Sequence, residues 1–354
     1  MWKTWQAAMQ EALYGPGGFY VRGEGPAAHF RTSVQVSARY AAALAALLRH
    51  VDAALGHPGR LDLVDIGAGQ GELLSQLLAV AGPALAGRIR AHAVEVAPRP
   101  AGLDERLCWA PVPPEPITGL VIANEWLDNV PLDVAELAAG GPRLVLVDTS
   151  TGAERTGPAV TGADLAWLHR WWPLHRAGDR AELGTPRCAA WAATIGRLDR
   201  GVAVAADYGH RRDGRPLAGT LAGFRHGRPV RPIPDGSRDI TAHVAVDACA
   251  AAGVAAGAAA TLLTTQRAAL RALGLTGQRP GLQHADRDPA GYLAALRQAA
   301  EEAELTDPAG LGGFSWLVQA VRLPIPEPLA RLASVPGGVR QDSSGPGVAA
   351  GRAR

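Results

Sequence analysis

A glycine-rich turn is the segment of this sequence best suited to bind a ligand. Asp65, Gly67, Gly69 and Gly71 lie between an apolar, strand-like segment and a helix-forming segment that begins at Glu72. Glycine allows the backbone to bend sharply and to approach a ligand without a Cβ clash. Because glycine occupies 43 of 354 positions, an ordinary tight turn is the alternative interpretation. The acidic residue two positions before the first glycine, and the flanking strand and helix, favour a nucleoside-binding turn.

Glu72 and Glu95 indicate which cofactor this turn would bind. A dinucleotide fingerprint, G-x-G-x-x-G, needs glycine where Glu72 stands, and a carboxylate there would face a pyrophosphate. S-adenosyl-L-methionine (SAM) has no phosphate and carries a sulfonium cation, which acidic groups attract. Glu95 ends the next apolar segment, where it can accept hydrogen bonds from ribose hydroxyls or be a solvated charge at a strand end. We therefore predict SAM as the cofactor and disfavour a nicotinamide oxidoreductase.

A second group of polar residues follows a later apolar segment, in the sequence ANEWLDNVP. Asn124, Glu125 and Asp128 are expected at the C-terminal end of a core strand, the end that faces the ligand crevice in open α/β sheets. One turn of helix would place Glu125 and Asp128 on one side. Two carboxylates can hold a protonated guanidinium group and aim one nitrogen at an activated methyl group. The alternatives are that they cap local backbone and that Asn124 contacts the cofactor.

The surrounding segments predict an α/β fold. Short apolar segments alternate with helix-forming ones, which is typical of a parallel sheet. Apolar residues recur at helical spacing over Ser37–Val51, where Ser37 can cap the helix. We expect a Rossmann-like class I methyltransferase fold with a mainly parallel sheet, an N-terminal lid and an inserted cap region.

The chain divides into four expected regions. Residues 1–50 are predicted to form the lid and a helical segment, and residues 51–323 the methyltransferase core. The strand rhythm breaks at about residues 132–198, where a hairpin-like pair precedes a tryptophan-rich stretch, so we expect an insertion that covers the pocket. Residues 324–354 are rich in proline, glycine and serine and are expected to be a disordered tail.

Bulk properties disfavour several other classes of protein. The formal net charge is +2 and the basic residues are scattered, so nucleic acid is not an expected partner. Cys108, Cys188 and Cys249 have neither metal-ligand nor disulfide spacing, and no metal is expected. The N-terminus lacks a signal-peptide pattern, and the apolar run Ala248–Leu263 is too short to cross a membrane. We expect a cytoplasmic protein without a membrane partner.

Separate segments of the chain together resemble the MidA family of methyltransferases. The matching segments occur in family order over about residues 14–320, and they are YGPGGFY, HFRTSVQVS, VDIGAGQGEL, VEVAP, ANEWLDNVP, ADYGH, GTLAGFRHG, DITAHV, TTQRAAL and GGFSWLVQA. The family pattern GDF-x-T-x-PE appears here as AHFRTSVQ, with His29, Val34 and Gln35 at the changed positions. The family's ANEFFDALP appears here as ANEWLDNVP.

This resemblance carries implications for the site and the function. It implies that Thr32 contacts SAM and that His243 lies near the active site, where a histidine can orient a catalytic carboxylate or be structural. The family includes a mitochondrial complex I assembly methyltransferase that modifies protein arginine. We therefore expect methylation of an arginine of a protein partner, with a non-catalytic SAM-binding assembly factor as the alternative. A homodimer is compatible with the sequence, which leaves the substrate and the oligomeric state open.

Overall fold

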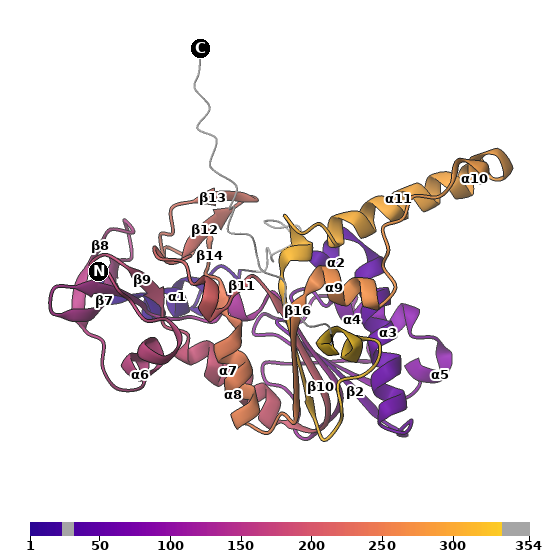
Figure 1. Cartoon of the computed structure of the whole chain (residues 1–354), viewed down its shortest axis with the longest axis horizontal. Coiled ribbons are helices and arrows are strands. Elements are labelled where there is room, and N and C mark those ends of the chain that lie inside the picture. Colours follow the sequence, from indigo (N-terminus) through magenta and orange to yellow (C-terminus); the bar gives the residue numbers. More distant parts are fainter. Residues whose placement is uncertain (23–31, 335–354) are drawn as a thin grey trace, which may run out of the picture.

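A seven-stranded sheet forms the centre of the protein (Figure 1). The computed structural model describes residues 1–22 and 32–334. The strand order is β16-β17-β10-β5-β2-β3-β4; the pairs from β10 to β4 are parallel, and β17 is antiparallel to both of its neighbours. The expected α/β fold with a mainly parallel sheet is confirmed. Its strands are β2 (Leu61–Ile66), β3 (Ile89–Val94), β4 (Leu107–Ala110), β5 (Ile117–Asn124), β10 (Leu198–Asp207), β16 (Ala260–Thr265) and β17 (Ser315–Val321).

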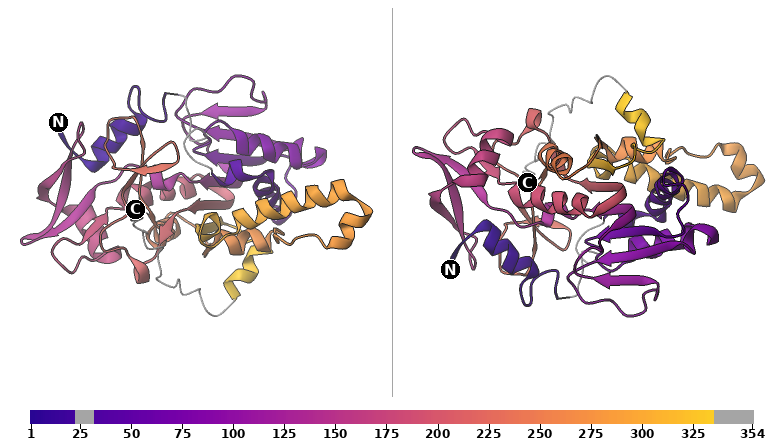
Figure 2. Two further views of the ribbon diagram at one scale, coloured as in Figure 1. Left: turned by 90° about the horizontal axis from the view of Figure 1, so that it is seen from above. Right: turned by 90° about the horizontal axis from the view of Figure 1, so that it is seen from below.

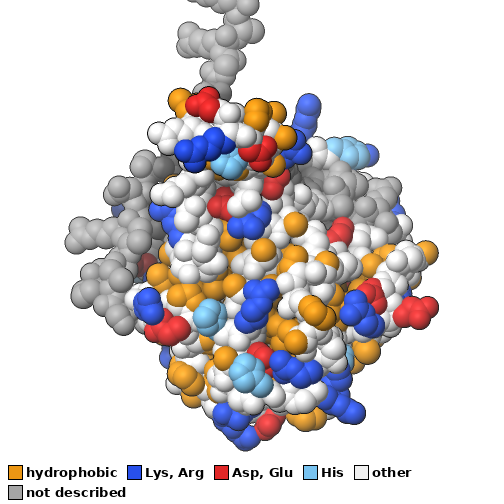
Figure 3. Space-filling model, turned by 90° about the vertical axis from the view of Figure 1, so that its right-hand side faces the viewer, with side chains coloured by type: hydrophobic (Ala, Val, Ile, Leu, Met, Phe, Trp, Pro, Cys, Tyr) orange, Lys and Arg blue, Asp and Glu red, His pale blue; other side chains and the backbone are white. Residues whose placement is uncertain are grey.

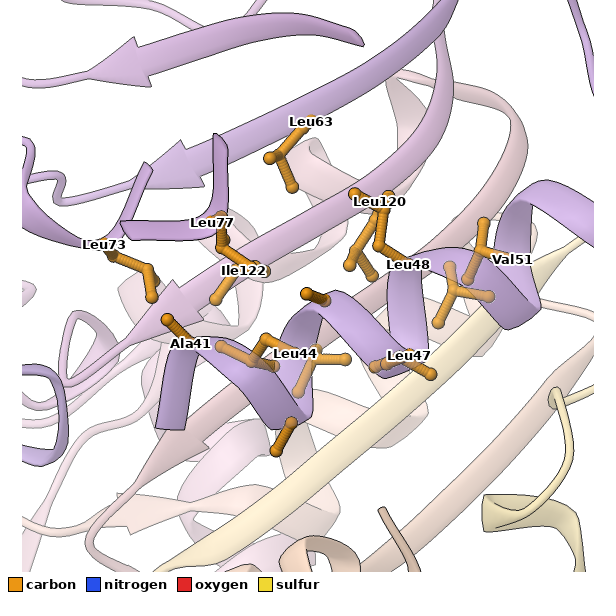
Figure 4. Packing of buried hydrophobic residues seen from close by; sticks show 14 of the residues in the cluster. Ala41, Leu44, Leu47, Leu48, Val51, Leu63, Leu73, Leu77, Leu120 and Ile122 are labelled. Atoms are coloured by element: carbon orange, nitrogen blue, oxygen red, sulfur yellow. The ribbon is translucent and has the colours of Figure 1, made fainter. Parts of the chain in front are cut away.

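Helices cover both faces of this sheet because its inner strands are apolar on both faces. In Figure 4, Leu48 of α3 lies beside Leu120 of β5, while the next residue of β5, Val121, belongs to the cluster on the other face. The Ser37 side chain caps α3 by accepting a hydrogen bond from the Arg39 amide, at 3.0 Å. The helices are α3 (Ala38–Ala54), α4 (Glu72–Val80), α5 (Pro83–Ala86) and α9 (Gln266–Ala272) on one face, and α7 (Thr185–Gly196) and α8 (Val246–Ala255) on the other.

A second, antiparallel sheet lies beside the core. Its strands are β1 (Trp2–Thr4), β6 (Val134–Ala138), β7 (Gly141–Asp148), β8 (Glu154–Ala159) and β9 (Arg180–Glu182). Val145 and Val147 of β7 are buried with residues of α1 (Trp5–Tyr14), and α6 (Gly162–Trp171) packs through Trp167 and Leu168. Because β1 pairs with β7, the start of the chain and the insertion form one sheet.

The segment predicted as an insertion, residues 132–198, contains two structurally different parts. Residues up to Glu182 belong to the second sheet and α6. Helix α7, in contrast, buries Trp191 and Ile195 against the core sheet. Parallel strands need a crossover connection, and α7 is the crossover helix between β5 and β10. The insertion therefore ends before Thr185, earlier than expected.

Smaller elements complete the fold around the two sheets. An arm made of α10 and α11 projects at the end of the molecule opposite the second sheet (Figure 2). These elements are β12 (Ala222–Arg225), β13 (Arg228–Val230) and β14 (Asp239–Thr241) in one sheet, β11 (Gly209–His210) paired with β15 (Val244–Ala245), α2 (Ser33–Val36), α10 (Leu282–Arg287), α11 (Pro289–Leu305), and the 3-10 helices η2 (Leu127–Asn129), η3 (Arg212–Gly214), η4 (Leu311–Gly313) and η5 (Leu329–Ser334).

The described surface and helices bear on two of the expected partners. On the face shown in Figure 3, basic side chains lie dispersed among acidic and apolar ones. None of the helices in residues 1–22 and 32–334 combines the length and apolar character that a bilayer crossing needs. The absence of a nucleic-acid partner stays a prediction.

The start of the predicted disordered tail is packed instead. Leu329 is 0% exposed and belongs to the same core cluster as Leu323, and Ile325 packs against that cluster. The packing of Ile325 and Leu329 thus outweighs the prolines that suggested disorder. Residues 335–354 lie outside the described residues.

Leu329→Ala is expected to lower the free energy of unfolding by about 2–5 kcal/mol, because it leaves a cavity in a filled core. Denaturant unfolding measures this change. Leu282→Ala is the matched control, since Leu282 is 76% exposed, and it should change stability by less than about 0.5 kcal/mol. Equal losses in the two variants would show that η5 does not stabilise the core.

Candidate active site

A cavity of about 820 Å³ lies at the C-terminal ends of the parallel strands. Residues at or just after the ends of β2, β3, β5 and β10 line it, which is where ligands bind in open α/β sheets. The N-terminal segment and the β12–β14 sheet close the opposite side. The cavity therefore has one wall from the core and one from the peripheral elements.

The glycine turn forms part of the core wall. Gly67, Gly69 and Gly71 all have left-handed backbone conformations, with φ of 74°, 57° and 79°. Gly67 and Gly69 line the cavity, as predicted for cofactor-binding positions. Gly71 does not belong to the described lining; a Cβ there would lie 3.2 Å from Leu103 and 3.5 Å from Trp109. Packing at the start of α4 therefore accounts for glycine at this position, and the predicted contact of Gly71 with the cofactor stays a prediction.

Glu95 lines the cavity and also holds this turn in place. Its carboxylate accepts hydrogen bonds from the amides of Gly69 at 2.9 Å, Val96 at 2.7 Å and Ala97 at 3.1 Å. A carboxylate has about four acceptor positions, so acceptor capacity remains toward the cavity. The predicted contact with ribose hydroxyls stays a prediction, and the bond to Gly69 is a second role that the sequence did not indicate.

Asp65 is a buried carboxyl group on the cavity wall, 3% exposed. Burial raises its pKa to about 8, with smaller contributions from the negative charges of Glu95 and Glu72. A cationic ligand would favour the ionised form of this group. SAM carries a sulfonium and an ammonium group, so Asp65 fits this cofactor.

SAM affinity is expected to increase by about tenfold or more between pH 6 and pH 8, because Asp65 ionises in this range and its negative charge attracts the cation. Calorimetric titration at the two pH values measures the effect. The isosteric Asp65→Asn variant should show a much flatter dependence. The same pH dependence in wild type and Asp65→Asn would contradict this role.

In the cavity wall at the end of β5, Asn124 and Glu125 are held by neighbours from distant segments. The Tyr40 hydroxyl donates to Asn124 Oδ1 at 2.6 Å, and Asn124 Nδ2 donates to Glu125 Oε1 at 3.0 Å. The Ser33 amide also donates to Glu125 Oε1, at 3.2 Å. Glu125 has a φ of 51°, an uncommon value for a non-glycine residue that often marks a functional site. Burial raises its pKa to about 7, and the nearby charge of Asp128 adds to this.

Asp128 lines the same cavity as Glu125, so the structure brings the two predicted carboxylates together. The expected helical turn does not hold both residues: the 3-10 helix η2 includes Asp128, whereas Glu125 precedes it with a φ of 51°. Asp128 Oδ2 accepts a hydrogen bond from Thr241 Oγ1 at 2.7 Å. Oδ1 is buried and has no hydrogen-bond partner within the described residues. A buried acceptor without a donor is costly, so a ligand N–H or O–H group that reached this atom would be favoured.

Thr32 and His243 also line the cavity. Thr32 begins α2 and forms a capping box with Gln35, whose side chain replaces the family's glutamate. The His243 ring stacks on Tyr208, with ring centroids 5.6 Å apart, and burial lowers its pKa. The His243 ring has no hydrogen bond to a carboxylate in the described part of the chain. Its proposed orienting role therefore has no support from contacts, and it contributes a neutral aromatic surface.

Several cavity residues escaped the sequence analysis. Asp239 accepts hydrogen bonds from Tyr20 at 2.9 Å and from Asn129 Nδ2 at 3.0 Å, and burial raises its pKa to about 7. Tyr14 donates to the Asn129 carbonyl at 3.2 Å. Asp239 begins the DITAHV segment, and Tyr14 and Tyr20 are the ends of YGPGGFY, so the family resemblance was a signal for all three. No local pattern, however, connects the two tyrosines to loops more than a hundred residues away.

The described lining of the cavity is strongly acidic. Its basic members are Arg197, which donates to the Pro113 carbonyl at 3.0 Å, and His243. No group of residues that could hold a metal ion occurs in the described ranges. The acidic members are Asp65, Glu72, Glu95, Glu125, Asp128 and Asp239.

Comparison with known proteins agrees with this arrangement. Residues 43–264 match the model of the Methyltransf_28 family, described as "Putative S-adenosyl-L-methionine-dependent methyltransferase". The chain belongs to this family. The methyltransferase therefore uses SAM as its cofactor, and the residues around the glycine turn fit that cofactor.

Solved structures extend the agreement to the whole fold. A COG1565 superfamily member from Burkholderia thailandensis bound to S-adenosyl-homocysteine has a TM-score of 0.74 and 26% sequence identity, over 90% of the methyltransferase and 88% of its own chain. A native structure of a COG1565 superfamily protein from the same organism has a TM-score of 0.72 and 26% identity, over 90% and 87%. Comparison with curated proteins finds no match.

Proposed function

We propose that this methyltransferase transfers the methyl group of SAM to an arginine side chain of a protein partner. The observation that carries the proposal is that Glu125 and Asp128 line one acidic cavity; Asp128 Oδ1 also has no hydrogen-bond partner in the described residues. A guanidinium group has five N–H donors, remains protonated and matches carboxylates in geometry. A cavity lined by carboxylates favours a cationic group with N–H donors, such as guanidinium, over a neutral methyl acceptor.

The residues of the chain would mainly orient the acceptor. SAM supplies a methyl group that is already activated for transfer. Holding two reactants in alignment can remove about 7–11 kcal/mol of a barrier, whereas a general base typically contributes about 10²–10⁴-fold. The new N–C bond forms as the S–C bond breaks, its electrons remain on sulfur, and the nitrogen loses a proton. Glu125, with a pKa of about 7, can accept that proton.

The resemblance to the MidA family supports the same acceptor, since its mitochondrial member acts on protein arginine. The altered N-terminal motif favours the alternative of a SAM-binding assembly factor that has lost methyl transfer. His29 lies outside the described residues, but Val34 and Gln35 line the cavity and leave it open to a ligand.

All three cysteines are free thiols, which agrees with the cytoplasmic location that we propose.

Methyl-labelled SAM distinguishes an enzyme from a binding module. The protein is incubated with the label in a lysate from cells that lack it, and the proteins are then separated. Label in a discrete protein band, dependent on the added methyltransferase, is the expected result. SAM binding without any transfer of label would favour the assembly factor, and label confined to small molecules would exclude a protein partner.

A further inference from the structure

One buried arginine lies behind the acceptor side of the cavity. Arg187, in the first turn of α7, is 1% exposed. Its Nε donates to the Val130 carbonyl at 3.2 Å, and its Nη1 donates to the carbonyls of Ala242 at 2.7 Å and His243 at 3.1 Å. Its Nη2 donates to the Asp128 carbonyl. One guanidinium group thus bonds four backbone carbonyls.

These carbonyls belong to two loops that are distant in the sequence. One loop follows β5 and carries Asp128, and the other follows β14 and carries His243. A direct hydrogen bond between the loops runs from the Ala242 amide to the Asp128 carbonyl, at 3.2 Å. Because Arg187 donates hydrogen bonds to both loops, it fixes the distance between them. The two loops carry Asp128 and His243, which line the cavity.

Arg187 also supplies a positive charge to a buried acidic region. Burial lowers the pKa of Arg187, and the charges of Asp128, Asp207 and Glu182 oppose that change. Burial likewise raises the pKa of Asp128, which the hydrogen bond from Thr241 and the charge of Arg187 oppose. The Asp207 carboxylate accepts a hydrogen bond from the Asp128 amide at 3.1 Å, so a second acidic group lies in this buried region. The cation therefore favours an ionised Asp128.

We infer that Arg187 is a positioning residue, which holds the Asp128 and His243 loops together and places a positive charge near Asp128 in the wall that would hold the methyl acceptor. This role rests on the proposed function. Within the described residues Arg187 does not line the cavity, so it acts through the residues that it bonds.

Two variants and one control test this role. Arg187→Ala removes the group, and Arg187→Lys keeps the charge but loses the forked geometry, so that a folded variant remains if the first one unfolds. Arg88→Ala is the control, because Arg88 also donates to a carbonyl, that of Pro58 at 2.7 Å, and pairs with Asp52 away from the cavity. The measurements are amide hydrogen exchange, SAM affinity by calorimetry, and transfer of label to lysate proteins.

We expect the Arg187 variants to disturb the two loops and methyl transfer but not SAM binding. In both Arg187 variants, exchange at the Val130 and Ala242 amides should increase by about tenfold or more, while SAM affinity stays within about threefold of wild type. Label transfer should fall by about a hundredfold in Arg187→Ala and by about tenfold in Arg187→Lys. About 10 mM guanidinium should restore protection and transfer to Arg187→Ala, whereas urea, its neutral analogue, should not. Arg88→Ala should leave exchange in both loops unchanged.

Other outcomes would overturn the inference. Unchanged exchange in both loops would show that Arg187 does not hold them. A parallel loss of SAM affinity and transfer, or equal rescue by urea, would show a general structural role. Amide hydrogen exchange is measured without a methyl acceptor, so it tests the positioning role independently of the substrate. Label on a residue other than arginine in the wild-type experiment would refute the proposed function alone.

Discussion

The Glu125→Gln variant is expected to bind SAM with wild-type affinity and to lose at least about 99% of its methyl transfer. The amide keeps the shape of the side chain and one oxygen for the Ser33 amide and Asn124, so the fold should survive. It removes the negative charge that would hold a guanidinium and the group that would accept its proton. The predicted SAM-binding residues Asp65 and Glu95 are unchanged.

The pH dependence gives this prediction a second readout. Glu125 has a pKa of about 7, so wild-type transfer should increase as the pH rises from 6 to 8 and the carboxylate ionises. At saturating SAM, where the pH dependence of SAM binding through Asp65 does not contribute, the residual transfer by Glu125→Gln should lack this increase. Glu105→Gln is the control, because it also removes one negative charge but from an exposed position. Wild-type transfer rates in Glu125→Gln would refute the assignment of Glu125.

The Gly69→Val variant is expected to fold and to bind SAM at least about a hundredfold more weakly. Gly69 has a φ of 57° and lines the cavity, and its amide donates to Glu95. A β-branched residue is strongly disfavoured in the left-handed region, so the turn must change shape where the cofactor binds. Calorimetric titration with SAM measures the loss.

Gly82→Val is a matched control for the backbone strain. Gly82 has a φ of 81°, and a Cβ there would meet no atom within 4 Å. With a ψ of 154°, Gly82 lies in a region of backbone space almost restricted to glycine, so the variant carries at least as much local strain as Gly69→Val. Because Gly82 lies between α4 and α5, away from the cavity, the variant should keep its SAM affinity. An unchanged affinity in a folded Gly69→Val protein would contradict the binding role of the turn.

Local patterns predicted the parts of the site that lie on single core segments. The turn at Gly67 and Gly69 and the carboxylates after β5 could be placed because strand, turn and helix follow each other within a few residues, and parallel strands bring their C-terminal ends together. Gly71 shows the limit of this reasoning, since the same glycine pattern serves packing against Leu103 and Trp109. A motif identifies a turn more reliably than it identifies each contact.

Long-range contacts explain what the sequence analysis missed. The pairing of β1 with β7 and the bonds from Arg187 to two loops join segments with no periodic or spacing relation. A basic residue in an amphipathic helix such as α7 is usually exposed, and only the carbonyls around Arg187 reveal why it is buried. The prediction of disorder around Leu329 was wrong for a different reason. Composition is an average over a whole segment, whereas a few apolar side chains determine whether that segment packs on the core.

The chemical position of the transferred methyl group tests the central claim most directly. Proteins labelled by the methyltransferase from methyl-labelled SAM are hydrolysed to amino acids, which are separated beside methylated arginine, lysine and histidine standards. The account predicts label in methylarginine with wild type, and almost none in any methylated amino acid with Glu125→Gln. Label in methyllysine or methylhistidine, or undiminished methylarginine with Glu125→Gln, would contradict it.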